Sequence, residues 1–415
     1  MANIRQRELL KMKISISLAR RFAAGCVAAV MAASVMSFGV FAEQPESLGI
    51  EVSDDGYVYL HKEKIAKKVG TNKYQMLMQK DAHANGAALN YLINNDEKKT
   101  IILPKGTCKT DRTIRPGSNT TVIATGTTVF QTDPQNTLVI HEPTRTDYKS
   151  IQHVKFKGGT WKISKNEKQL RSTSTFRFNF ASDITLDGCT IMTNYRSHAL
   201  ELIACKKVKV NNCKLISKGT PASDTLEEAL QIDLSTKATA PSVAAYGSKF
   251  VKGQTCSDIT VSGCTINGGR GICANKTDTE GGKYLGKYHK NITIVGCKVT
   301  GVTSEAVALH NAVGVKVKNN TIVSKGSRTD TVYTIGLNIA LFKSNSISTK
   351  YKNVISGNTV KGGRQAIYMG SYAGNKYGTT VIKNNKLYCK KGKDNALAVK
   401  DCKKLFKSGN KTYKW

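Results

Sequence analysis

Side chains that can act as acids, as bases or as cations that neutralise an anion recur at matching points of four similar stretches. The stretches begin at residues 198, 228, 270 and 305 and read HALELIA, EALQIDL, RGICANK and EAVALHN. Two carboxyl groups can hydrolyse a glycosidic bond, one as the acid and the other as the base or nucleophile. An imidazole can instead remove the proton beside a sugar carboxylate, provided that a cation neutralises that carboxylate.

These roles define two sets of candidate residues. The catalytic candidates are Glu228, Asp233, Arg270 and His310. In a hydrolase the carboxyl pair would be Glu228 and Asp233, whereas in a lyase His310 or His289 would be the base, with Arg270 or a bound Ca²⁺ as the cation. The residues leave hydrolase and lyase open, and they assign no metal ligand. The substrate-binding candidates are His198, Glu201, Gln231, Asn275, Tyr288, His289 and Glu305.

The same side chains also have a structural interpretation. A ladder of ion pairs in which Glu228 bridges His198 and Arg270 would place these residues together without any substrate. For each residue taken alone, this ladder is the better explanation. The concentration of His, Asp, Glu and Arg in the middle of the chain favours a site for the group as a whole.

The candidate residues lie in a repeat that must position them. One repeated phrase is a strand, a two-residue break and a second short strand, as in DITLDGCTI from 183 and NITIVGCKV from 291. The other is a small residue followed by apolar residues at every second position, which is a β-strand pattern. The two alternate with a spacing of roughly 23 to 50 residues, which is typical of a solenoid. We therefore predict an all-β fold of stacked parallel coils.

Stacking explains why the break carries cysteine in some repeats and asparagine in others. Equivalent positions of successive coils lie about 4.8 Å apart, so the break positions form one column. Cysteine would fill the interior as a small apolar side chain, and asparagine by bonding its amide to the next asparagine. We expect the cysteines of this column to be buried, unreactive thiols. The predicted column is Gly159, Cys189, Cys213, Cys264, Cys297, Asn320, Asn358 and Asn385.

The same stacking predicts which strand residues face outward. With Leu200 pointing inward, Glu201 lies in one outward column, and Asp233, Asn275 and His310 follow one another in the column beside it. Insertions flank these coils and would form the walls of a groove in which substrate binds. The insertions are residues 217–227, 236–256 and 276–290.

The chain ends differ from the repeat. Residues 1–42 are basic and then apolar, and they end in small residues, which predicts a cleaved signal peptide and a secreted or cell-surface protein. An uncleaved segment would be the chain's contact with a membrane. Residues 43–98 form an N-terminal segment, in which 81–96 reads as an amphipathic helix that caps the solenoid. Residues 99–415 form the solenoid itself.

The charge balance bears on the kind of partner that the chain could bind. The chain has 63 Lys and Arg against 29 Asp and Glu, a net charge of +34. Such a surplus favours a polyanion or a solvated basic surface. No nucleic-acid-binding motif or aromatic base-stacking series accompanies it, so we expect no nucleic-acid partner. A polysaccharide, acidic in this interpretation, is the expected partner, and the oligomeric state is left open.

At this point the sequence resembles right-handed parallel β-helix proteins of the pectin-lyase-like superfamily, of the secreted bacterial type. TIILPKGTCK from 100 resembles the superfamily's first coil, and the NITIVGCKVTG copies resemble later coils. The resemblance implies a carbohydrate-related role. The polygalacturonase motifs are absent from the coils, and the one Asp-Asp pair, Asp54-Asp55, precedes them. Two hypotheses therefore remain: a polysaccharide lyase or glycoside hydrolase, and a non-catalytic glycan-binding protein of the cell surface or cell wall.

Overall fold

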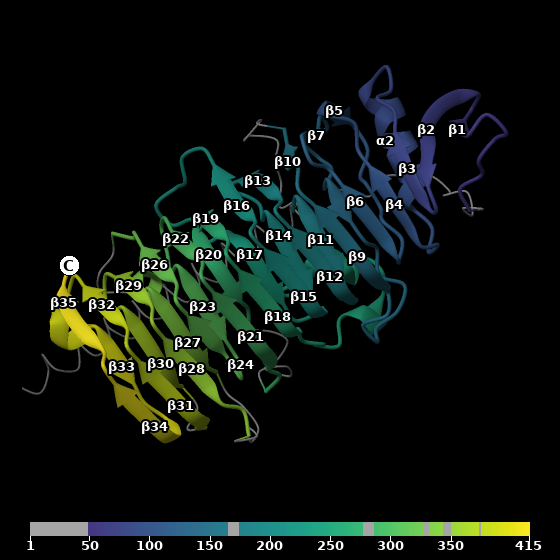
Figure 1. Cartoon of the computed structure of the whole chain (residues 1–415). Coiled ribbons are helices and arrows are strands. Elements are labelled where there is room, and N and C mark those ends of the chain that lie inside the picture. The colour runs from purple at the N-terminus through teal and green to yellow at the C-terminus, as the bar shows by residue number, and fades with distance from the viewer. Residues whose placement is uncertain (1–48, 165–173, 277–285, 328–331, 343–349, 373–374) are drawn as a thin grey trace, which may run out of the picture. The chain divides into compact units, whose positions relative to one another are not determined.

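The computed structural model shows the predicted repeat as coils of three short strands each (Figure 1). It describes residues 49–164, 174–276, 286–327, 332–342, 350–372 and 375–415. The predicted signal peptide and most of the 276–290 insertion lie outside these residues. Among the described residues, no helix is both long and apolar enough to span a membrane.

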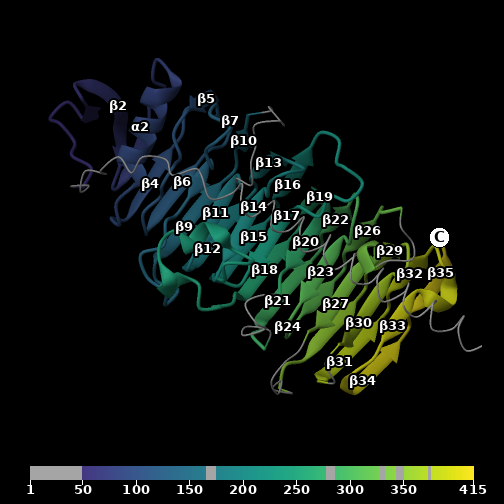
Figure 2. The ribbon, with the colours of Figure 1, turned by 180° about the vertical axis from the view of Figure 1, so that it is seen from behind.

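Most coils contribute one strand to each of three sheets, which run side by side through the coils (Figures 1 and 2). Within the described residues all strand pairs are parallel except those of β1 with β2 and β2 with β3. Sheet 1 contains β1 (Tyr57–Leu60), β2 (Glu63–Gly70), β3 (Lys73–Met76), β4 (Lys99–Ile102), β6 (Thr120–Ile123), β9 (Ile151–Lys157), β12 (Ala181–Asp187), β15 (Lys206–Asn211), β18 (Ser257–Ser262), β21 (His289–Val295), β25 (Lys316–Lys318), β28 (Asn353–Ser356), β31 (Tyr377–Lys383) and β34 (Cys402–Ser408), with β24 (Ala312–Val313) beside β21.

The other two sheets are built in the same order of coils. Sheet 2 contains β5 (Gly106–Thr110), β7 (Thr127–Gln131), β10 (Thr160–Ile163), β13 (Thr190–Asn194), β16 (Lys214–Lys218), β19 (Thr265–Gly268), β22 (Lys298–Gly301), β26 (Thr321–Ser324), β29 (Thr359–Gly362), β32 (Lys386–Cys389) and β35 (Lys411–Lys414). Sheet 3 contains β8 (Val139–Ile140), β11 (Phe176–Asn179), β14 (Leu200–Ile203), β17 (Glu228–Asp233), β20 (Arg270–Ala274), β23 (Val307–His310), β27 (Leu337–Leu341), β30 (Ile367–Ser371) and β33 (Leu397–Val399).

The predicted column of break residues lies inside the coils. The backbone N–H of Cys264 donates to Sγ of Cys297 at 3.4 Å, and the N–H of Cys297 donates to Oδ1 of Asn320 at 2.8 Å. Asn320 in turn donates from its N–H and its Nδ2 to Oδ1 of Asn358, at 3.0 and 2.9 Å. Cysteine and asparagine are therefore equivalent here because each accepts the amide N–H of the preceding coil. All ten cysteines of the described residues are free thiols.

The residue before each column position turns the chain out of sheet 1. It adopts a positive φ, for example 67° at Gly188 and 53° at Asn212, a conformation that Gly and Asn tolerate better than other residues. This requirement explains the Gly or Asn in the first place of the repeated break.

The predicted capping helix is α2 (Ala82–Ile93). The side chain of Asp81 accepts the N–H of Ala84 at 2.8 Å and so caps the first turn. Leu89, Leu92 and Ile93 are buried in the same apolar core as the first coil. Residues 57–76, which the sequence pattern did not place, form the antiparallel strands β1 to β3, and β3 pairs in parallel with β4.

Candidate functional site

Sheet 3 has the register that the sequence predicts. Glu201 pairs with Gln231, and Ile203 pairs with Asp233. Glu228 pairs with Arg270, although the 236–256 insertion separates their strands. The insertion therefore causes no slip, and the outward columns are those expected.

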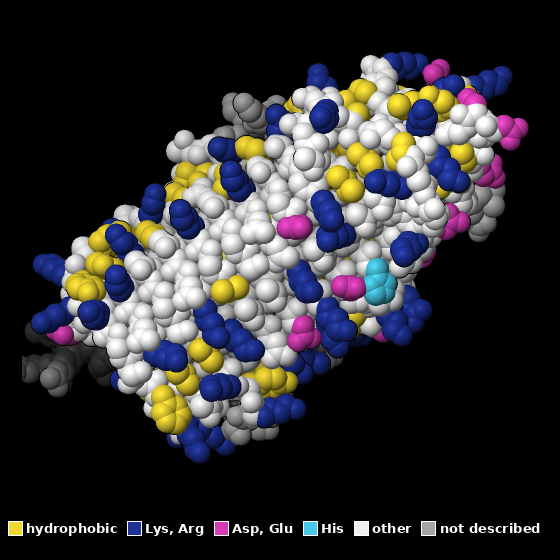
Figure 3. Space-filling model, viewed as in Figure 1, with side chains coloured by type: hydrophobic (Ala, Val, Ile, Leu, Met, Phe, Trp, Pro, Cys, Tyr) yellow, Lys and Arg dark blue, Asp and Glu magenta, His cyan; other side chains and the backbone are white. Residues whose placement is uncertain are grey.

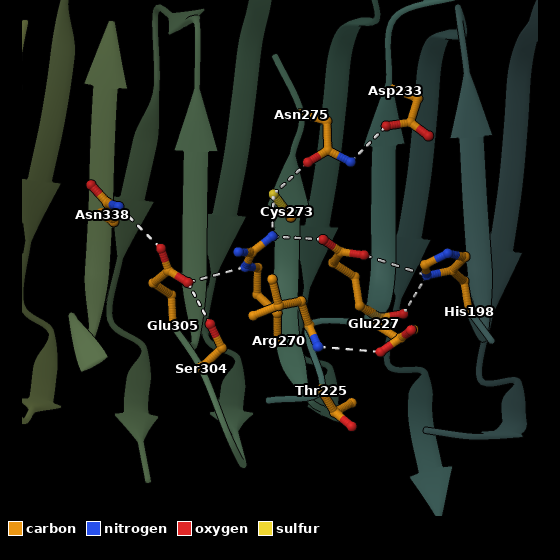
Figure 4. A network of polar contacts seen from close by, with 12 residues as sticks. His198, Thr225, Glu227, Asp233, Arg270, Cys273, Asn275, Ser304, Glu305 and Asn338 are labelled. Atoms are coloured by element: carbon orange, nitrogen blue, oxygen red, sulfur yellow. Dashed lines mark hydrogen bonds and ion pairs between the residues drawn. The ribbon is translucent and has the colours of Figure 1, made fainter. Parts of the chain in front are cut away.

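The outward charges form a continuous ladder across the coils (Figure 4). Nδ1 of His198 lies 3.6 Å from Oε2 of Glu228. The other carboxylate oxygen of Glu228, Oε1, accepts a hydrogen bond from Nη1 of Arg270 at 2.8 Å. Nε of Arg270 donates to Oε2 of Glu305 at 3.1 Å, and Nδ2 of Asn338 donates to Oε1 of Glu305 at 3.2 Å. We call these five residues the ladder.

The ladder is buried, which contradicts its predicted place along an open groove. Glu228, Arg270 and Glu305 are 6%, 7% and 1% exposed. Burial would lower the pKa of Arg270, but Glu305 and Glu228 beside it raise that pKa well above its ordinary value. Burial likewise opposes the charge of Glu305, yet Arg270 holds the pKa of this carboxyl below 4.5. The geometry is that of the ion-pair ladder given above as the structural alternative.

A second buried ion pair adjoins the ladder on the preceding coil. Nε of Arg177 donates to Oε2 of Glu201 at 2.5 Å, and Ser174 donates to the same oxygen. Burial tends to raise the pKa of Glu201, but Arg177 and His198 hold it below its usual value. Glu201, predicted to touch substrate, is 4% exposed and faces its own cation instead. Gln231, the next residue of that column, is also buried.

Asp233 is the candidate whose environment is least like that of a solvent-exposed carboxylate. It is fully buried, and its Oδ1 accepts Nδ2 of Asn275 at 2.8 Å. Its Oδ2 has no hydrogen-bond partner among the described residues. Burial first, and the nearby charge of Glu201 second, raise the pKa of Asp233 well above 3.8. The pair with Asn275 was predicted, but the position in a groove open to substrate was not correct.

Two residues were predicted to lie at the rim of the groove. This prediction is wrong for His289, and Tyr288 is only partly exposed. His289 begins β21 in sheet 1 and is 1% exposed. Its Nδ1 accepts the N–H of Cys256 at 3.1 Å, and its Nε2 donates to the carbonyl of Asn275 at 2.8 Å. Burial lowers its pKa to about 4. Tyr288 is half-buried and packs against the core.

The 236–256 insertion covers part of the outer face of sheet 3. It contains α3 (Pro241–Ala244) and the short helix η1 (Ser248–Phe250). Val243 and Phe250 from this insertion pack on Phe180 and Ile203, and the rings of Phe250 and Phe180 lie 5.4 Å apart. An insertion expected to wall a groove thus lies on the sheet.

A cluster of aromatic rings follows on the next coils, and only one of its members was a candidate. The ring of His310 lies edge-on to Phe342 at 5.3 Å. Phe342 stacks on Tyr372 at 4.9 Å with an interplanar angle of 20°, and Tyr372 lies 6.1 Å from Tyr368. Tyr372 is 54% exposed, and the other three side chains are half-buried.

Two lysines extend this cluster. Nζ of Lys276 lies 4.3 Å from the centre of the Phe342 ring, and Nζ of Lys400 lies 5.9 Å from that of Tyr372. These are cation–π distances. We call the surface formed by His310, Phe342, Tyr368, Tyr372, Lys276 and Lys400 the platform.

The platform shows what the sequence pattern missed. Phe342 directly follows β27, and Tyr372 directly follows β30, where each chain leaves sheet 3. Neither residue is within the repeated phrase, so neither was assigned to a column. An aromatic residue directly after two successive copies of the sheet 3 strand was the available sign. No group of three or more His, Cys, Asp or Glu in the described residues is arranged to hold a metal ion.

The chain resembles known proteins in its fold but not in its sequence. No protein-family model and no curated protein sequence matches the chain. Among solved structures, the Streptococcus pneumoniae surface protein and adhesin PfbA is 13% identical, with 75% of this chain and 88% of that chain covered and a TM-score of 0.50. The chain has the right-handed parallel β-helix fold.

Two further structures have lower scores. An exopolygalacturonase from Thermotoga maritima is 11% identical over 79% of this chain and 88% of its own, with a TM-score of 0.48. An alginate lyase from Paenibacillus is 10% identical over 80% of this chain and 93% of its own, with a TM-score of 0.42. At these identities the likeness concerns the fold alone.

Proposed function

We propose that this pectin-lyase-like chain is a secreted bacterial protein that binds an anionic polysaccharide on its outer surface without cleaving it. The observation that carries the proposal is the platform, where stacked rings and two ammonium groups lie together on the outer surface. Because the rings are stacked on one another, their exposed edges are the apolar surface that sugar C–H groups can contact, while the lysines attract carboxylates or sulfates. A single ligand that offers both features is an acidic glycan.

The spacing of the platform suits a polymer. Phe342 and Tyr372 come from successive coils, and their 4.9 Å separation is close to the spacing of hydrogen-bonded strands. Because the backbone of sheet 3 fixes this spacing, little conformational entropy is lost when a ligand binds. A chain of sugars running along the stack would contact the edges of successive rings and the two ammonium groups beside them.

The charge of the chain supports the same partner. On the face shown in Figure 3, Lys and Arg side chains are spread widely, with few Asp and Glu between them. With a net charge of +34, the protein attracts polyanions over distances of about a Debye length. The predicted signal peptide supports the proposal that the protein meets its ligand outside the cell.

The alternative is a polysaccharide lyase or hydrolase acting at Glu228, Asp233, Arg270 and His310. One observation favours it: the raised pKa of Asp233 is what a general acid needs. Against it, Asp233 is fully buried, and Glu228 and Arg270 are satisfied by each other. We therefore rank binding above catalysis.

Affinity electrophoresis of the purified protein tests the proposal. The gels would contain polygalacturonate, alginate or hyaluronan, with dextran as the neutral control, and each polymer would also be assayed for new reducing ends and absorbance at 232 nm. The proposal expects retardation by at least one acidic polymer, none by dextran and no products. Product formation would establish the enzyme instead, and a lack of retardation in all three acidic gels would refute glycan binding.

A further inference from the structure

A pocket lies away from the platform, at the corner between sheets 2 and 3. It has a volume of about 200 Å³ and is lined by Asn194, Tyr195, Arg196, Lys218, Thr220, Ala222 and Thr225. Asn194 ends β13 and Lys218 ends β16, and these two residues are register partners on adjacent strands. One wall is therefore fixed by the sheet, and the other is the 219–227 loop.

The loop wall is held in place by hydrogen bonds. The carbonyl of Thr225 accepts the hydroxyl of Thr303 at 2.5 Å, and the N–H of Thr225 donates to the carbonyl of Ala222 at 3.1 Å. Thr225 lies near Glu227 and Arg270 in Figure 4, at the N-terminal end of the sheet 3 strands. On the opposite wall, the Tyr195 hydroxyl accepts Nδ2 of Asn267 at 3.1 Å. The pocket is thus formed in advance of any ligand.

The lining has the chemistry of an oxyanion site. Arg196 and Lys218 are exposed cations, and the lining contains no Asp or Glu. Asn194 is 6% exposed, its Oδ1 accepts the N–H of Arg196 at 2.9 Å, and its Nδ2 has no partner in the described residues. A buried donor without a partner is costly, and a ligand oxygen would remove that cost.

We propose that this pocket binds a small carboxylate-bearing molecule of about the size of one sugar unit. Arginine offers a planar fork of N–H donors that matches a carboxylate, and the lysine and the asparagine amide add charge and a further donor. The volume is below the roughly 300–1,000 Å³ of pockets for drug-sized ligands, which favours a single ring. The pocket is formed by different residues from the platform, so this proposal does not depend on the platform.

Calorimetric titration of the full chain with D-glucuronate, and with D-glucose as the neutral analogue, tests this site. We expect glucuronate to bind and glucose not to bind. Lys218→Ala and Arg196→Ala should each weaken glucuronate at least threefold. Asn194→Asp should weaken it at least tenfold, because it keeps the acceptor for the N–H of Arg196 but replaces the donor with a negative oxygen.

The matched control is Lys214→Ala, which removes the same charge from the same strand outside the pocket and should leave the affinity unchanged. The proposal is overturned if glucuronate does not bind, if glucose binds equally, or if Lys214→Ala and Lys218→Ala have the same effect. Failure here is distinct from failure of the platform, since pocket variants should keep their retardation in polysaccharide gels and platform variants should keep glucuronate binding.

Discussion

At the scale of single residues, the structure depends on side chains that accept a backbone N–H from the preceding coil. Sulfur does this in Cys264 and Cys297, and an amide oxygen does it in Asn320 and Asn358. The sequence predicted this column because the break recurs at a fixed place in every repeat. It did not predict the same role for His289, because the role occurs at another corner, where its neighbours are cysteines.

The asparagine column gives a prediction about stability. Asn358→Ala removes the acceptor for both the N–H and the Nδ2 of Asn320, and should cost about 2–3 kcal/mol of unfolding free energy. Asn358→Cys should recover part of this loss, because a thiol fills the same role two coils earlier. Urea denaturation of both variants measures the difference. Equal losses in the two variants would show that the position needs volume rather than an acceptor.

His289 gives a prediction about pH. Its pKa is about 4 in the folded chain against 6.5 ordinarily, so the unfolded chain binds the proton more readily between these values. The stabilising effect of a neutral His289 is complete above pH 6.5 and is lost as the pH falls toward 4, by about 3 kcal/mol. His289→Asn, which keeps an acceptor for Cys256, should lose less stability between pH 7 and pH 4.5. Thermal melts that show the same pH dependence for both proteins would contradict this account.

At the scale of elements, the register of sheet 3 was predicted correctly, but the exposure of its outward side chains was not. The stacking of successive coils placed Glu228, Arg270 and Glu305 in one column, and the strand pairing has this register. This stacking does not show what packs over the outer face. That depends on insertions without a repeat, such as the segment carrying Val243 and Phe250, and on the charges satisfying one another.

The ladder predicts a large effect of one substitution. Arg270→Met leaves Glu228 and Glu305 buried without their cation, and should cost about 3–5 kcal/mol. The control is Arg145→Met, which breaks an exposed pair with Asp147 and should have no measurable effect. Chemical denaturation compares the two. A loss for Arg270→Met no larger than that of the control would mean that the ladder does not stabilise the coils.

At the scale of the whole chain, the fold and the charge could be predicted from the sequence, but the platform could not. Repeats of strand patterns determine a parallel β-helix because each coil can bury its apolar residues only against the next. The platform is different, since Lys276, Phe342, Tyr372 and Lys400 lie far apart in the chain and meet only because the coils stack. No short motif contains them.

The central claim is that the platform holds an acidic glycan, and one measurement tests it most directly. Retardation in polygalacturonate, alginate and hyaluronan gels would be compared for the wild type, Tyr372→Ala/Lys400→Ala and the control Phe406→Ala/Lys407→Ala. The control also removes one exposed ring and one lysine, but from sheet 1. Loss of a stacking ring and a cation should weaken binding about tenfold or more in the platform variant and leave the control unchanged. Equal retardation of all three proteins, or equal weakening of both variants, would contradict the account.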